Sequence, residues 1–221
     1  MDKLDYKTLA KTDPMGPQPQ CGTQADEDLS PMDTPESYDA ALPVQVDMEM
    51  MHPFIKEMME EHIELTSFVK TFEESIDVLQ KKKVVDPEAI EGVESFFNFF
   101  ESEFTPHNRK EEREFFPLLK VKLVELGEHG SGDDPVTGVD VLESEHVQAI
   151  QLAAITYHCF VLYSQIDDVN SKLTILASAI KNAKELIELL KLHIYREDKI
   201  LFCQAQQLMT TEEMDLMHQK L

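Results

Sequence analysis

The chain has 221 residues, of which 42% are hydrophobic and only seven are glycine, a composition that excludes a wholly disordered chain and favours helices over a turn-rich sheet protein. Forty-three acidic residues against twenty basic ones give a formal net charge of −23, which repels phosphate backbones and anionic membrane surfaces. Since no secretory signal pattern is present and no apolar run approaches the roughly 20 residues that span a bilayer, we predict a soluble, cytoplasmic protein with no nucleic-acid and no membrane partner.

The first 43 residues differ in composition from the rest of the chain. They hold six of the eleven prolines and the acidic stretch Asp26-Glu27-Asp28. Such a segment buries little apolar surface, so we predict that residues 1–43 form an acidic, proline-rich N-terminal extension that is flexible or draped over the surface. This tail offers a docking segment for a protein partner. Residues 44–221 are predicted to form the folded domain.

Apolar residues at helical spacing define two helices in the first half of the folded domain. Positions three and four apart fall on one face of an α-helix. The inner face of the first helix is predicted to consist of Met51, Ile55, Met58, His62, Leu65, Val69, Phe72 and Ile76. The second helix follows the start signal Asp86-Pro87, and its inner face consists of Val93, Phe96, Phe100, Phe104, His107, Glu111, Phe115 and Leu118. Pro106 lies inside this helix, where a proline removes a backbone hydrogen bond and kinks the helix.

A glycine-rich loop from Gly127 to Gly138 leads into a second pair of helices. The predicted inner faces are Val139, Leu142, His146, Ala149, Ala153 and Tyr157 on the third helix, and Leu186, Leu190, His193, Glu197, Ile200 and Leu208 on the fourth. A short C-terminal helix starts at Thr210 or Thr211, because Thr210 and Glu213 have the spacing of a capping box. Four amphipathic helices predict an all-α fold, an up-down four-helix bundle.

The second pair of helices repeats the first. The Glu-His pair at 61–62 recurs at 145–146, and the His-x-x-x-Glu motif at 107–111 recurs at 193–197. The two histidines of each half are 45 residues apart in the first half and 47 in the second. The chain is therefore read as two similar helical hairpins.

All four predicted inner faces carry polar residues at one level of the bundle. Burying unpaired imidazoles or carboxylates is costly, so a bound metal is the economical explanation. The predicted metal ligands are His62, His107, Glu111, His146, His193 and Glu197. Nitrogen and oxygen donors without sulfur suit iron, manganese or zinc, and two bridging carboxylates beside four imidazoles suit a pair of irons best. We predict two non-haem iron ions with an oxo or hydroxo bridge and about one open position per iron, where a small diatomic molecule or peroxide binds.

Over roughly residues 47–208 these motifs resemble the hemerythrin-like family of HHE cation-binding, di-iron proteins. The matching pieces are Glu-Glu-His62, His107-x-x-x-Glu111-Glu112, Glu143-Ser-Glu-His146 and His193-x-x-x-Glu197-Asp198. The resemblance implies binding or reduction of dioxygen, peroxide or nitric oxide, in redox sensing, storage or detoxification, with peroxidase-like or other oxidoreductase turnover as one form.

One position departs from the family's oxygen carriers, and another matches them. Those proteins have a further histidine one turn after the third-helix histidine, where this chain has Ile150. Their last ligand lies five residues after the fourth-helix histidine, and in this chain that position is Asp198. Asp198 is therefore the alternative to Glu197 as the last metal ligand. Reversible oxygen transport is therefore not the leading prediction.

Two alternative functions follow from the same motifs. The six-ligand set is similar to the di-iron proteins that repair iron–sulfur clusters under nitrosative or oxidative stress, although their N-terminal domain with adjacent cysteines is replaced here by a tail with the single Cys21. The other alternative is an iron- or oxygen-responsive interaction module, in which metal binding stabilises the bundle and the tail recruits a partner.

The remaining histidines and three glutamates receive weaker assignments. His52, His129, His158 and His218 lack a ligand partner at helical spacing and are expected at the surface or in the outer surroundings of the centre. Glu61, Glu112 and Glu145 are expected on solvated helix faces, because neighbouring helix positions diverge by about 100°. The alternative is that they accept hydrogen bonds from the ligand imidazoles.

Overall fold

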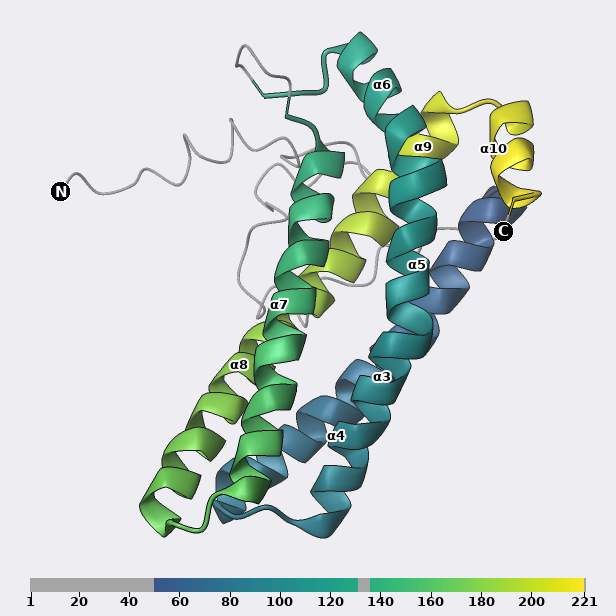
Figure 1. The fold of residues 1–221 in the computed structure, drawn as a ribbon. Helices are drawn as coiled ribbons and strands as arrows, with labels where there is room; N and C mark the ends of the chain where they lie inside the picture. The colour runs from purple at the N-terminus through teal and green to yellow at the C-terminus, as the bar shows by residue number, and fades with distance from the viewer. Residues whose placement is uncertain (1–49, 131–135, 221) are drawn as a thin grey trace, which may run out of the picture. The chain divides into compact units, whose positions relative to one another are not determined.

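The computed structural model describes residues 50–130 and 136–220, and every regular element in these ranges is helical. In chain order the elements are α3 (Pro53–Lys82), α4 (Pro87–Phe99), η2 (Phe100–Phe104), α5 (Thr105–Lys110), η3 (Glu111–Phe115), α6 (Phe116–Leu126), α7 (Gly138–Gln165), α8 (Val169–Arg196), η4 (Glu197–Leu201), α9 (Phe202–Leu208) and α10 (Thr211–His218) (Figure 1). The prediction of an all-α, up-down helical bundle is confirmed. The predicted extension 1–43 and part of the Gly127–Gly138 loop lie outside the described residues.

The second and fourth predicted helices each contain π-helical segments, named η2, η3 and η4. The amide that follows each segment donates to a carbonyl five residues earlier: Thr105 to Phe100, Phe116 to Glu111, and Phe202 to Glu197. A π turn contains one residue more than an α turn, and single π turns are frequent at functional sites. Glu111 and Glu197 are the first residues of η3 and η4, so the two hairpins place the irregularity at equivalent glutamates.

Two prolines follow π segments directly. Pro106 is the second residue of α5, and Pro117 is the second residue of α6. A proline in an α-helix clashes with the carbonyl four residues earlier, which here belongs to Ser102 or Arg113, inside the π segment. The wider turn accommodates the ring, and helical residues continue past Pro106. At the position where the sequence predicts a kinked helix, the structure thus has a π turn, η2, immediately before α5.

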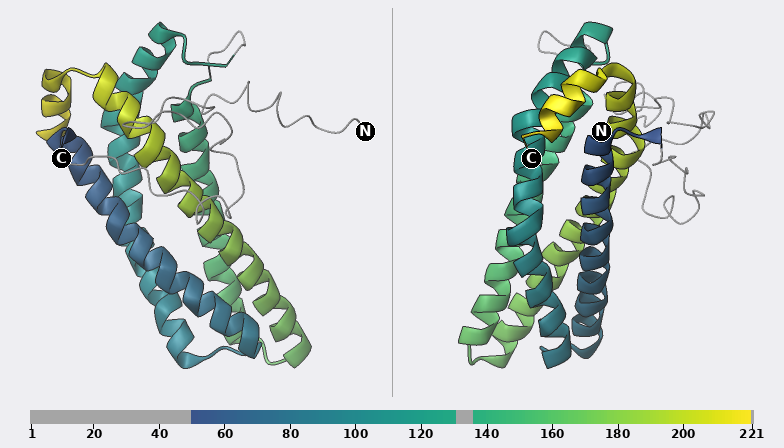
Figure 2. Two further views of the ribbon diagram at one scale, coloured as in Figure 1. Left: turned by 180° about the vertical axis from the view of Figure 1, so that it is seen from behind. Right: turned by 90° about the vertical axis from the view of Figure 1, so that its right-hand side faces the viewer.

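The described residues group into two compact units. Unit 2, residues 61–109 and 145–191, contains parts of four helices, and the turns α3–α4 and α7–α8 lie at the same end of it (Figures 1 and 2). Lys191 and Lys184 of α8 bind Glu73 and Asp77 of α3. The ring of Phe97 on α4 meets the ring of Tyr157 on α7 with their centroids 5.5 Å apart. Within unit 2, α3 therefore contacts α8, and α4 contacts α7.

Aromatic stacking and one close approach join α3 to α4 within unit 2. Phe72 stacks on Phe96 with ring centroids 4.1 Å apart, and Phe68 stacks on Phe99 at 4.0 Å. A Cβ atom on Gly92 would lie 2.1 Å from the hydroxyl of Ser75, so the helices cross at a distance that only glycine permits without rearrangement.

Unit 1 consists of residues 50–60, 110–130, 136–144 and 192–220 among those described. Its core contains Met51, Phe54, Ile55, Met58, Met59, Phe115, Phe116, Leu119, Leu123, Val139, Leu142, Leu201, Phe202, Cys203, Ala205, Met209, Met214 and Met217. Gly127 ends α6 with a φ of 81°, which glycine adopts without steric cost, and its neighbour's amide bonds back to Leu123. These contacts fix the end of α6 on the unit 1 core.

Within unit 1, the helix α10 packs against the start of α3 (Figure 2). Thr210 and Glu213 form the predicted capping box at its start. His52 lies 3.2 Å from Asp215, and His218 lies 3.1 Å from Glu57. The surface assignment of His52 is therefore wrong, because its ring is buried as a structural contact to α10.

The predicted inner faces agree with the observed burial except at Tyr157 on the third helix and at Leu118 and Leu208, which are only partly buried. All eight predicted positions of the first helix are buried, including Met51, which precedes α3. On α7, however, Tyr157 is 51% exposed, and Thr156 is the buried residue. The prediction for Tyr157 is wrong because α7 carries apolar residues on its outer face as well, so their spacing alone does not identify the inner one. None of the described helices has the combination of length and apolar character needed to cross a membrane.

Candidate metal centre

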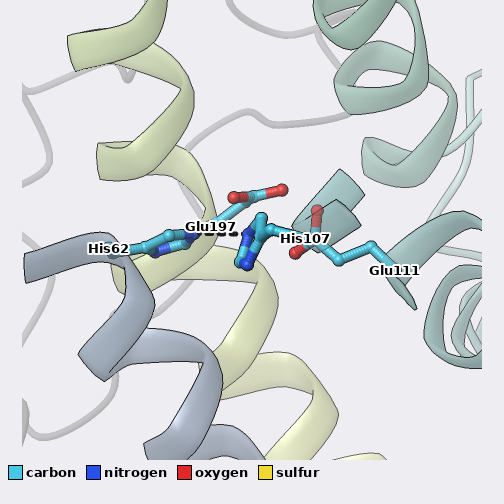
Figure 3. A group of neighbouring side chains, drawn as sticks. All are labelled: His62, His107, Glu111 and Glu197. Atoms are coloured by element: carbon cyan, nitrogen blue, oxygen red, sulfur yellow. Dashed lines mark hydrogen bonds between the residues drawn. The ribbon is translucent and has the colours of Figure 1, made fainter. Parts of the chain in front are cut away.

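Two buried imidazoles from different helices face each other. His62 lies on α3 and His107 on α5, and their Nε2 atoms are 3.0 Å apart (Figure 3). Their ring centroids are 4.8 Å apart and the rings are tilted by 58°. Both Nε2 atoms therefore point at a common position in the interior.

Glu61 fixes the orientation of His107. Its Oε2 lies 2.6 Å from Nδ1 of His107, and a carboxylate in this position accepts the Nδ1 hydrogen. The Nε2 lone pair of His107 is then directed towards His62, the arrangement that holds metal-binding histidines in other proteins. The expectation that Glu61 lies on a solvated face is thus wrong. The side chain is long enough to reach from α3 to α5 although its backbone position points away from the inner face.

The two glutamates of the His-x-x-x-Glu motifs are fully buried. Glu111 and Glu197 each show 0% exposure, and both begin a π segment. In the second motif, Nε2 of His193 lies 3.3 Å from Oε2 of Glu197. His146 on α7 is also buried, and its ring lies at 86° to that of Phe104, with the centroids 6.4 Å apart. All six predicted ligands are therefore interior residues.

The six side chains form two groups that share both glutamates. One group contains His62, His107, Glu111 and Glu197, and the other contains Glu111, His146, His193 and Glu197. Within each group the ligand atoms lie within 4.8 Å of one another, and every member is buried. Figure 3 shows the first group, with the side chains directed towards one another. Asp198 belongs to neither group, so this geometry does not support Asp198 as the last metal ligand in place of Glu197.

The donor geometry fits a metal ion. When two nitrogens bind the same metal ion at about 2.1 Å each, with a nitrogen–metal–nitrogen angle of 90°, they lie about 3.0 Å apart. The distance between the Nε2 atoms of His62 and His107 is 3.0 Å, and the nitrogen-to-oxygen distance between His193 and Glu197 is close to this value at 3.3 Å. Imidazole and carboxylate donors suit iron, manganese and zinc. The residues present thus match a cation site in both spacing and chemistry.

The weaker candidates lie elsewhere. Ile150, which occupies the place of a further histidine in oxygen carriers, is 47% exposed on the outer side of α7. His129 and His158 are exposed, and Glu112 is exposed while Glu145 is buried. No sequence signal identified Glu61 over Glu112, because both adjoin a ligand position. The deciding factor is whether a neighbouring helix brings an imidazole within reach.

The family comparison agrees with this geometry. Residues 53–205 match the model of the hemerythrin HHE cation-binding domain, which covers more than half of the chain. The chain therefore belongs to the hemerythrin family, and the predicted resemblance is confirmed. Neither the curated proteins nor the solved structures yield a match. The family assignment and the buried clusters together identify a cation-binding protein of this class.

Proposed function

We propose that this protein is a non-haem di-iron protein that binds or reduces small oxidants such as dioxygen, peroxide or nitric oxide. The observation that carries the proposal is the sharing of Glu111 and Glu197 by the two ligand groups. In this arrangement His62 and His107 would hold one cation, His146 and His193 would hold the other, and Glu111 and Glu197 would contribute to both. Two cations with one shared pair of carboxylates form one centre.

Iron is the proposed metal because of the donor set and the remaining coordination capacity. Two imidazoles and two carboxylate oxygens supply four donors per cation, whereas iron in such surroundings takes about six. The remaining capacity leaves room for a bridging oxygen and a small external ligand. A di-iron centre supplies two redox-active ions that transfer two electrons to an oxidant.

The protein residues hold and shield this centre. Glu61 orients His107 through its Nδ1 hydrogen, which leaves Nε2 free of its own proton for the metal. Phe104 packs in a T-shaped pair with His146, and the ligands themselves are almost fully buried. Exclusion of bulk water strengthens the electrostatic attraction between carboxylates and cations. Because the ligands are buried, we expect only small molecules to reach the metal centre.

Metal analysis combined with an optical spectrum tests the proposal. We expect protein purified with ample iron to contain two irons per chain and to show the near-ultraviolet absorption of an oxygen-bridged ferric pair. After anaerobic reduction, one equivalent of peroxide should reoxidise one iron pair, since peroxide takes up two electrons and two protons to give two waters.

The possible outcomes separate metal binding from redox chemistry. A colourless protein that holds two zinc ions and no iron would preserve the cation site but reject the oxidant function. Protein that holds no metal after reconstitution would reject both. A reduced iron pair that is not oxidised by peroxide, dioxygen or nitric oxide would likewise reject the oxidant function.

A further inference from the structure

The outer face of α7 is unlike the rest of this strongly acidic chain. Residues 147–166 contain no Asp, Glu, Lys or Arg, although the whole protein has a net charge of −23. Five large apolar side chains on this helix remain about half exposed: Val147, Ile150, Ile155, Tyr157 and Leu162. Large charge-free, apolar faces on a helix that is already packed on its inner side mark interaction sites.

Three of these exposed residues, Val147, Ile150 and Tyr157, belong to a heptad pattern, whereas Ile155 and Leu162 lie on an adjoining face of the helix. Val147, Ile150, Ala154, Tyr157 and Val161 are separated by steps of three and four residues and form a stripe, here called the outer seam. Steps of three and four residues keep these side chains on one side of the helix, where they can pack against a second helix as in a coiled coil. The inner-face positions of α7, Leu142, His146, Ala149 and Ala153, form a separate buried stripe. The helix therefore has two faces suited to packing: the buried inner face, and the outer seam, on which Val147, Ile150 and Tyr157 stay about half exposed among the described residues.

We propose that the outer seam binds α7 of a second copy of this chain, in an antiparallel pair centred on Ala154. In such a pair the small Ala154 side chains meet at the two-fold axis, which lets the helices approach closely. Val147 then faces Val161 of the second copy, and Ile150 lies beside His158 of the second copy. The seam is thus complementary to itself.

Charge favours a second copy as the occupant. Two chains of charge −23 repel each other over most of their surfaces, so they associate most readily through a face without charges. An oppositely charged partner would instead be expected to contact acidic side chains, which this face lacks. The outer seam is therefore the surface through which identical acidic chains meet at the lowest electrostatic cost.

Apolar side chains form the centre of the proposed interface. Val147, Ile150 and Tyr157 of the outer seam are each about half exposed. Ile155 and Leu162 are similarly exposed on an adjoining face of α7, at the edge of the pair. A stable interface buries about 800 Å² per partner, and the polar Gln151 and His158 supply part of it. Tyr157 is already held against Phe97 and acts as a preorganised aromatic anchor.

Sedimentation of the full chain over a wide range of concentrations tests this proposal. We expect a reversible dimer in the wild type. Ile150→Glu places two carboxylates in the pair and should weaken dimerisation by at least about tenfold. The matched control is Val121→Glu on α6, since Val121 is 53% exposed and lies off the seam. Unchanged circular dichroism and metal content in both variants show that each still folds.

A cysteine placed at the axis tests the antiparallel geometry. In a chain carrying Cys21→Ser and Cys159→Ser, Ala154→Cys should form a covalent dimer under mild oxidation, whereas Val121→Cys should not. A wild type that is monomeric at all concentrations, or a dimer equally sensitive to both glutamate variants, overturns the proposal. Absence of the Ala154→Cys crosslink in a dimer that Ile150→Glu disrupts overturns the antiparallel pairing about Ala154.

Discussion

The helices α3 and α7 begin the two hairpins of the repeat, and they agree on their inner faces while differing on their outer ones. Each carries a Glu-His pair, at 61–62 and 145–146, with the histidine buried. In the 20 residues that follow the histidine, α3 has seven charged side chains and α7 has none: those of α3 are Glu64, Lys70, Glu73, Glu74, Asp77, Lys81 and Lys82. The inner faces therefore share buried candidate ligands, whereas the outer faces differ in charge.

The largest expected effect comes from the two shared glutamates. Glu111→Ala or Glu197→Ala removes a donor from both ligand groups, so we expect each variant to lose most of both irons and all oxidation by peroxide. His107→Ala or His193→Ala removes a donor from one group only, so about one iron per chain should remain. Iron analysis of the four variants checks both statements.

The matched control for these variants is His158→Ala, because His158 is exposed on α7. It should retain the wild-type iron content. Equal losses for the first and second hairpins would support their equivalence, and unchanged iron in the glutamate variants would refute the shared-ligand assignment.

Metal binding should also raise the stability of the fold. Cations that bind only the folded chain stabilise it by about 4 kcal/mol when their free concentration is a thousand times Kd, equivalent to roughly 10 °C in Tm. Thermal melts of apo and iron-loaded protein measure this shift. The double variant Glu111→Ala/Glu197→Ala should show none of it, and a wild-type Tm indifferent to iron would contradict the prediction.

Glu61→Gln tests the orienting role of Glu61 in the first hairpin. The loss of a carboxylate partner at Nδ1 of His107 should lower metal affinity by about 10- to 100-fold without removing a ligand. Competition with a chromophoric chelator measures the change. Glu112→Gln is the control because Glu112 is exposed, and Glu145→Gln shows whether the second hairpin depends on its equivalent residue. An affinity unaffected by Glu61→Gln would rule out the orienting role.

A smaller effect is expected at the start of α7. Burial raises the pKa of Asp140, but hydrogen bonds from Lys120 and from Thr137 outweigh this, and the pKa lies below its usual value. Asp140 therefore stabilises the fold above its unfolded pKa of about 3.9, and the contribution disappears as the pH falls through the lower folded pKa. Asp140→Asn should cost about 1 kcal/mol at neutral pH, the typical value of a helix-start contact.

Denaturant unfolding at several pH values measures the effect of Asp140→Asn. The difference from the wild type should shrink below about pH 4, where the wild-type carboxyl becomes protonated. A difference that stays constant from neutral to acidic pH would show that the charge of Asp140 is not the cause.

The smallest expected effect lies at the end of α3. Lys83 has a φ of 54°, a left-handed conformation that glycine adopts at lower cost. Lys83→Gly should stabilise the protein by about 0.5–1 kcal/mol, as measured by denaturant unfolding. Lys81→Gly, inside the last turn of α3, should destabilise it instead, because glycine weakens a helix interior. A destabilising Lys83→Gly would refute this account.

Much of the fold was predictable because it rests on one periodicity. Buried residues recur three and four positions apart along α3 and along the second helix up to Phe115, and this spacing alone places His62, His107 and Glu111 on inner faces. The duplication of the motif then identified the equivalent residues of the second hairpin. The spacing of apolar residues is sufficient to identify the inner face of a helix that has only one apolar face.

The features that the sequence did not reveal depend on contacts between helices. Tyr157 was misplaced because α7 is apolar on two sides, and His52 was misplaced because its partner Asp215 lies more than 160 residues away. The contact of Glu61 with His107 likewise depends on the distance between α3 and α5. The π turns leave no residue-type signal of their own, since η4 is followed by Cys203 where η2 and η3 are followed by a proline.

The π turn at Glu111 makes chain length a functional property of this helix. Because a π turn contains one residue more than an α turn, removing a single residue from Glu112–Phe115 would convert it to an α turn and leave Leu119 and Leu123 directed at the core. Such a deletion should therefore preserve the fold while changing the turn that begins at the buried Glu111. A one-residue deletion from Phe116–Leu126, which has no extra residue to lose, should instead rotate the rest of that helix by about 100° and remove Leu123 from the core.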